Sequence, residues 1–146
     1  MNNLSEGKIP LISAKKIENG LKGFFKQNSK KLYNGHCITL NLDGDGGAGI
    51  AYYQHSRMAL DSHVCALYPK IRQDKYSLLF MAKSITKQGN AYGHGHSINN
   101  NRLRVFKIML PVKSDNEPDY EFMSSYMKNV ECRQLQEYIN AKLVDL

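Results

Sequence analysis

VFKIMLPVKSDNEPDYEFMSSYMK, residues 105–128, is the stretch that decides how this chain is organised. Its first part, Val105–Val112, is short and apolar, which favours a strand. A polar break at Ser114–Glu117 separates that segment from a pattern with helical spacing. We therefore expect a compact domain over residues 1–113 and an appended C-terminal helix over residues 114–146.

The appended segment carries apolar side chains at spacings of three and four residues, as on one face of a helix. These residues are Phe122, Met123, Tyr126, Met127 and Val130. An isolated helix of this length is marginally stable in water, so its apolar stripe needs a partner. We expect a spacer and dimerisation helix that pairs with a second helix as a coiled coil. Packing back onto its own domain is the alternative.

The residues upstream of this helix predict a domain that is mostly β. Alternating and β-branched residues predict short strands at 8–13, 36–42, 50–54 and 63–68, with a further strand beginning at 24–25. The Gly-rich run Asp43–Gly49 predicts the turn of a hairpin. Residues 74–86 change to a helical period, with Asp74 as the N-cap. The predicted fold class is therefore α+β, with one packed helix and a long C-terminal spacer helix.

Length and composition exclude several classes of protein. A chain of 146 residues, 42% of them hydrophobic, suits one domain plus an appendage. No apolar run approaches the ~18 residues that a membrane span needs, and the N-terminus lacks the order of a signal peptide. The three scattered cysteines predict reduced thiols. We expect a cytoplasmic protein that does not enter the membrane.

Charge is distributed unevenly along the chain, whose net charge is +7. Residues 68–113 hold nine basic residues against Asp74 alone, whereas residues 114–146 are acidic on balance. A basic domain of this kind is typical of proteins that bind a polyanion such as nucleic acid. A basic surface that serves only solubility is the alternative.

Two polar segments are candidates for contact with such a partner. The run DGDGGAG at 43–49 can expose backbone amides, although it matches neither a phosphate loop nor a calcium loop. A plain hairpin turn is its alternative reading. Residues 87–101 are almost without apolar side chains and predict a long loop rich in hydrogen-bonding groups. The alternative reading of this second segment is a solvated loop. We expect residues 43–49 and 87–101 to share one surface.

The sequence predicts no catalytic residue and no metal site. His94 and His96 lack the partners of a zinc site, and Cys65, two residues after His63, lacks an orienting acid. The basic domain lacks the clustered acids of a two-metal nuclease. No signature for binding S-adenosylmethionine is present.

Four segments in this order resemble the target recognition domain of a type I restriction–modification specificity subunit. They are residues 7–25, 41–53, 84–104 and 106–123. The resemblance implies that the chain reads one half of a split double-stranded DNA target, while its helix pairs with a second helix. It also implies that a methyltransferase subunit docks on the chain and carries the S-adenosylmethionine. A restriction subunit then joins through the complex, and any magnesium is bound by partner subunits.

The resemblance carries a DNA-binding role onto residues in the loops. These are Lys22, Asp45, Gly46, Lys87, Tyr92, His94, His96, Asn99, Asn100 and Arg102.

Members of the family usually have two recognition domains, two helices and a segment before the first strand, whereas this chain has one domain and one helix. A half-length subunit that pairs with a second copy or a second specificity chain is one explanation. A truncated remnant is the other. The alternative functions are a remnant that only binds proteins and a small nuclease fused to a recognition domain.

Overall fold

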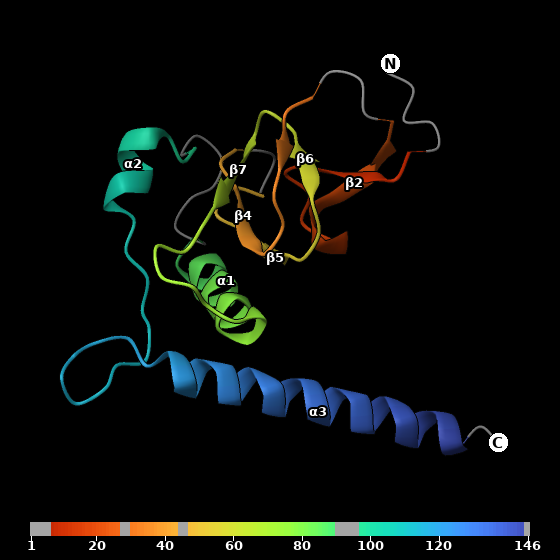
Figure 1. Cartoon of the computed structure of the whole chain (residues 1–146), viewed down its shortest axis with the longest axis vertical. Coiled ribbons are helices and arrows are strands. Elements are labelled where there is room, and N and C mark those ends of the chain that lie inside the picture. Colours follow the sequence, from red (N-terminus) through yellow and green to blue (C-terminus); the bar gives the residue numbers. More distant parts are fainter. Residues whose placement is uncertain (1–6, 27–29, 44–46, 90–96, 145–146) are drawn as a thin grey trace.

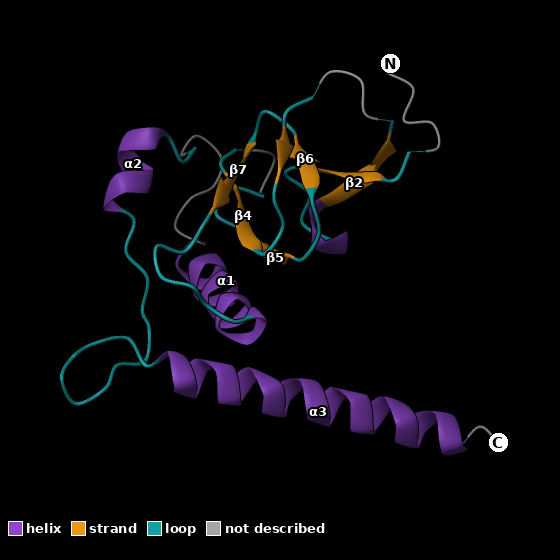
Figure 2. Cartoon of the chain, viewed as in Figure 1, coloured by secondary structure: helices purple, strands orange, loops and turns teal. Residues whose placement is uncertain are grey.

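The computed structural model describes residues 7–26, 30–43, 47–89 and 97–144. Within these residues, seven short strands form two sheets beside one packed helix, and a long C-terminal helix runs along one side (Figures 1 and 2). The predicted α+β class is confirmed. No helix in the described part of the chain has both the length and the apolar character that a membrane span requires.

The first sheet is built largely from the N-terminal segment. Its strands are β1 (Ile9–Ile12), β2 (Leu21–Phe25), β3 (Leu32–Tyr33) and β6 (Met58–Leu60), in the order β2-β1-β6-β3. Strands β1 and β6 are parallel, and the other neighbours are antiparallel. A short 3₁₀ turn, η1, links β1 to β2 and spans Glu18–Gly20.

The second sheet holds the predicted hairpin. Strands β4 (Cys37–Asn41) and β5 (Ala51–Gln54) pair antiparallel, as the Gly-rich run between them predicted. Strand β7 (Val64–Leu67) pairs antiparallel with the other edge of β4. Every residue of β4 is buried, because one face lies under a helix and the other packs towards the first sheet. Strand β4 is thus the centre of the fold.

Helix α1 (Lys75–Gly89) covers the second sheet. Leu78, Ala82 and Ile85, buried on one face of the helix, pack with buried residues of β4 and β5. The predicted N-cap is confirmed, since the Ser77 N–H donates to Asp74 Oδ1 at 2.8 Å. Near its other end, the Thr86 hydroxyl accepts from the Ala51 N–H at 2.9 Å, which fixes the end of α1 against β5.

The prediction of a strand at 105–112 is wrong. Residues 100–105 instead form helix α2 (Asn100–Val105), and helix α1 continues to Gly89. The loop predicted at residues 87–101 is therefore shorter at both ends. The segment after α2 is extended but belongs to no sheet in the described chain, apart from one bridge between Val112 and Pro118. The cause is packing: Phe106 and Ile108 rest on the main core cluster, so apolar burial occurs without a ladder of hydrogen bonds.

Helix α3 (Tyr120–Val144) divides into two halves. Its first half packs on α1, and Met123 in this half is completely buried. Lys75 and Tyr76 of α1 donate to the Glu131 carboxylate at 2.8 and 2.7 Å. These bonds hold the pKa of Glu131 below its ordinary value. This half of the helix therefore packs back onto its own domain, as the alternative interpretation expected.

The second half of α3 projects away from the domain, as Figure 1 shows. Its large apolar side chains stay exposed, namely Leu135, Tyr138, Ile139 and Leu143. In the predicted stripe, Phe122 and Tyr126 are also about half exposed, whereas Met127 and Val130 are partly buried. The helix thus retains an apolar surface that the described chain does not cover.

Candidate nucleic-acid interface

The Gly-rich turn and the end of α1 meet at one end of the second sheet. A Cβ atom at Gly89 would lie only 2.2 Å from the carbonyl oxygen of Gly49, so the two backbones are in direct contact. Gly49 has a φ of +83°, which an L side chain rarely adopts. Beyond α1, the Ile98 N–H donates to the Leu42 carbonyl at 2.7 Å. The described ends of the two candidate segments therefore lie close together.

The second candidate segment, residues 87–101, ends in helix α2. The Asn99 side chain caps this helix by accepting from the Arg102 N–H at 2.9 Å. The Arg102 guanidinium donates to the Ser97 carbonyl at 2.6 Å, which uses one of its five N–H groups. Asn99 and Asn100 are exposed. The geometry therefore leaves amide and guanidinium donors available at the surface.

Lys87 lies in the last turn of α1 and is exposed, one turn beyond the exposed Lys83. Both side chains also border a groove of about 650 Å³ between α1, residues 109–111 and the start of α3. Apolar residues make up much of the groove lining, including Phe80, Phe122 and Tyr126. Lys87 is therefore close to the Gly49–Gly89 contact and also to an apolar surface.

Lys22 does not join the other candidates. It lies in β2, on the opposite side of the molecule from α2 (Figure 1). Its ammonium group pairs with Asp61 at 3.1 Å. The pKa of Asp61 is lowered mainly by a hydrogen bond from the Ser62 N–H, with Lys22 as a further cause. The structure thus places Lys22 apart from the other described candidates, in a contact between β2 and the residue that follows β6.

Five of the residues chosen from the sequence lie outside the described residues: Asp45, Gly46, Tyr92, His94 and His96. In the ranges that are described, no group of three or more His, Cys, Asp or Glu side chains is placed to hold a metal ion. Burial raises the pKa of the Cys37 and Cys65 thiols, which is typical of packing residues.

The sequence analysis missed one exposed basic segment. Lys70 and Arg72 follow β7 in the loop that leads to α1, and both side chains are exposed. They contributed to the charge of residues 68–113 but formed no recognisable motif. The signal that could have singled them out is their position directly after Pro69, because proline is disfavoured within strands and common in surface loops.

Comparison with known proteins gives two matches. The family model described as "Type I restriction modification DNA specificity domain" matches residues 2–142. The "Type II restriction enzyme BgcI specificity subunit S.BcgI" of Heyndrickxia coagulans is 30% identical over 129 residues, which are 88% of this chain. The aligned part is 37% of that relative, so the chain spans well under half its length. No solved structure matches the chain. The match over nearly all residues shows that the chain belongs to the family of type I restriction modification DNA specificity domains.

Proposed function

We propose that this chain reads one half-site of a split duplex DNA target and performs no chemistry itself. The observation that carries the proposal is the contact of Gly49 with Gly89, which brings together the described ends of the two candidate loops. Membership of a DNA specificity family supports the same conclusion. In the specificity subunit of the relative, this region accounts for about a third of the length, which fits one recognition unit of a larger assembly.

The chemistry of the surface suits the two parts of sequence recognition. Lys87 and Arg102 supply positive charge that binds phosphates without regard to sequence. Asn99, Asn100 and Arg102 offer the amide and guanidinium groups that make paired hydrogen bonds to base edges. Any S-adenosylmethionine and magnesium belong in this proposal to partner subunits, and the chain contributes no catalytic residue.

Two of the site residues give the first prediction. Arg102→Ala and Lys87→Ala are each expected to weaken binding to a DNA duplex and to make the plot of log affinity against log salt concentration shallower by about 0.9. Arg102→Ala should also reduce the preference for the target over random DNA, because only base contacts discriminate. Fluorescence anisotropy across a salt series measures both effects. A slope equal to that of the unmodified chain would contradict the phosphate contacts.

The proposed function itself is tested by retention on random duplexes at low salt. We expect the purified chain, alone or with its methyltransferase subunit, to be retained and to be released as salt increases. If neither form is retained, the chain is not a DNA-reading module. A remnant that only binds proteins would then be the better account, since the exposed apolar surface of α3 favours protein contacts.

We also propose that the projecting half of α3 pairs with a helix of a second copy or of a second specificity chain, and that the methyltransferase subunit docks on the resulting assembly. Exposed Tyr138 and Ile139 provide the apolar contact, with 63% and 49% of their surface accessible. The restriction subunit joins through the same complex.

Substitution of this surface gives the second prediction. The double change Tyr138→Ser and Ile139→Ser is expected to convert an assembled chain into a monomer, because it removes two of the large apolar side chains that the projecting half exposes. Light scattering measures the mass, and Gln134→Ser on the same helix is the control. An unchanged mass in the double variant would show that α3 does not mediate assembly.

A further inference from the structure

The loop between β7 and α1 has an exposed tip, Lys70–Ile71–Arg72. Both ends of this loop are held down. The Tyr68 hydroxyl donates to the Asn34 carbonyl at 2.9 Å, and His36 Nε2 lies 2.7 Å from the Gln73 carbonyl oxygen. The tip between these anchors extends into solvent, and Ile71 is 68% exposed. A well-anchored loop thus holds an aliphatic side chain between two cations.

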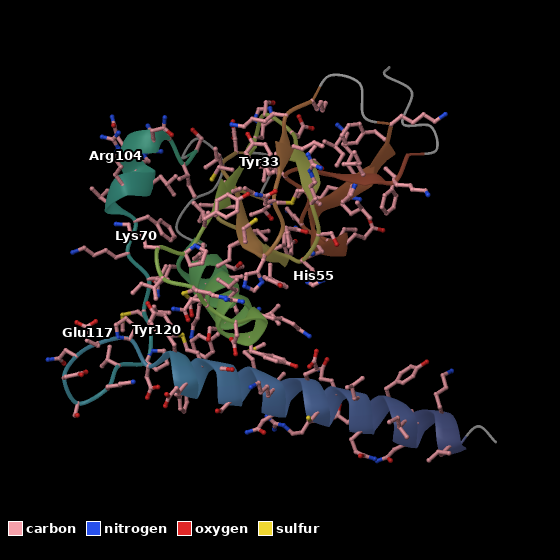
Figure 3. The ribbon with its side chains drawn as sticks, in the orientation of Figure 1. Tyr33, His55, Lys70, Arg104, Glu117 and Tyr120 are labelled. Atoms are coloured by element: carbon pink, nitrogen blue, oxygen red, sulfur yellow. The ribbon has the colours of Figure 1, made fainter. Side chains whose placement is uncertain are left out.

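A second segment of the same character lies on the same side of the domain. After α2 begins, Arg104, Val105, Lys107 and Met109 are all exposed. Leu67, at the base of the loop, packs on the same core cluster as Phe106 and Ile108. Figure 3 shows Lys70 and Arg104 on the side of the ribbon that carries α2. A single exposed apolar residue needs no explanation, but a group of them interleaved with cations does.

The charges of this surface are unbalanced. Lys70, Arg72, Arg104 and Lys107 form no ion pair with any acidic residue that the structure describes. The one acidic residue of the 68–113 segment is Asp74, and its carboxylate is occupied by Ser77 and Ser124 where α1 meets α3. Four cations without a local counter-charge suit a polyanion.

We propose that Lys70–Ile71–Arg72 is a second DNA-contacting element, which binds the same duplex as α2. Lys70 and Arg72 bind phosphates, and Ile71 packs against sugars and base edges in the groove between them. Aliphatic side chains make such groove contacts beside Arg and Lys in other DNA-binding proteins. The inference rests on the proposed function, because it requires a duplex at α2, but it assigns the contact to a loop that the family resemblance did not single out.

The test separates the charged contacts from the apolar contact. In a salt series with random duplex DNA, the double variant Lys70→Gln and Arg72→Gln should make the slope shallower by about 1.8, or 0.9 for each lost phosphate contact. Ile71→Ser should weaken binding about tenfold without changing the slope, as expected when one aliphatic side chain no longer leaves water. The effect of the double variant on the slope should be the same for every DNA sequence, because phosphate contacts carry no sequence information.

Matched controls exist elsewhere in the chain. Ile17, which precedes η1 near the first sheet, is 64% exposed, so Ile17→Ser makes the same chemical change at a similar exposure. Lys113→Gln with Lys142→Gln removes two charges from other exposed positions. Thermal unfolding should be similar for all of these variants, because every altered side chain is exposed.

Four outcomes are informative. Weaker binding in the loop variants and not in the controls supports the proposal. If the loop variants bind DNA as the controls do while Arg102→Ala still weakens binding, the proposal is overturned and the proposed function stands. Loop variants that bind DNA normally but lose affinity for the methyltransferase subunit overturn it in favour of a protein contact. Failure of the unmodified chain to bind any duplex is instead the failure of the proposed function.

Discussion

Replacing Gly89 with alanine is expected to destabilise the domain and to abolish most of its DNA binding. The new Cβ atom would lie 2.2 Å from the Gly49 carbonyl oxygen and 2.6 Å from the Gly49 Cα. Both are backbone atoms, so the steric clash can be relieved only if the turn moves away from α1. We expect a loss of about 2–3 kcal/mol in the free energy of unfolding, typical of overpacking, and larger than the ~1 kcal/mol that alanine gains in helix propensity.

The effect on binding should exceed the effect on stability. The contact that is lost holds the Gly-rich turn against the end of α1, from which the second candidate loop starts, so we expect the substitution to affect both loops. Urea unfolding and duplex affinity, measured on the same samples, separate the two effects. Gln88→Ala, one position earlier in α1, is the control, because it removes side-chain atoms and adds none. A stable Gly89→Ala variant with normal affinity would show that this contact does not organise the DNA surface.

Replacing Met123 with alanine is expected to release the first half of α3 from α1. The Met123 side chain is completely buried, and truncation of a buried methionine costs about 2–5 kcal/mol. The hydrogen bonds of Asp74 and Glu131 that join the helices should then open more readily. Hydrogen exchange of the α3 amides, together with urea unfolding, measures the change.

Phe122→Ala is the control for this prediction. Phe122 is the neighbouring residue and is 50% exposed, so its truncation should cost clearly less than that of Met123. Equal losses for the two variants would show that α3 is not held to the domain by its buried face. In that case the stripe would act only as a surface for a second helix.

Sequence patterns predicted the elements whose periodicity is regular. The hairpin of β4 and β5 followed from alternation around a Gly-rich turn, and α1 followed from its apolar face and the cap at Asp74. The long helix α3 was equally clear. The family resemblance placed the two candidate loops in one domain, and the structure brings their described ends together at Gly49 and Gly89.

Other features depended on tertiary contacts that a local pattern does not contain. The apolar segment 105–112 looks like a strand, yet it is buried by side-chain packing and pairs only at Val112. Strands β3 and β6 are two and three residues long, too short for alternation to be visible. The apolar stripe of α3 did not indicate that the first half of this helix packs on α1. The family resemblance grouped Lys22 with the loop residues, and no local pattern indicated that it pairs with Asp61, on the other side of the domain from α2 (Figure 1).

Amide chemical-shift mapping by NMR tests the central claim most directly, and a chain of 146 residues is suited to it. A random duplex at low salt is titrated into the labelled protein. The account predicts perturbations that concentrate in residues 47–49, 68–73 and 97–107, and that disappear as salt increases. Perturbations confined to residues 9–25 of the first sheet, or to the projecting half of α3, would contradict it.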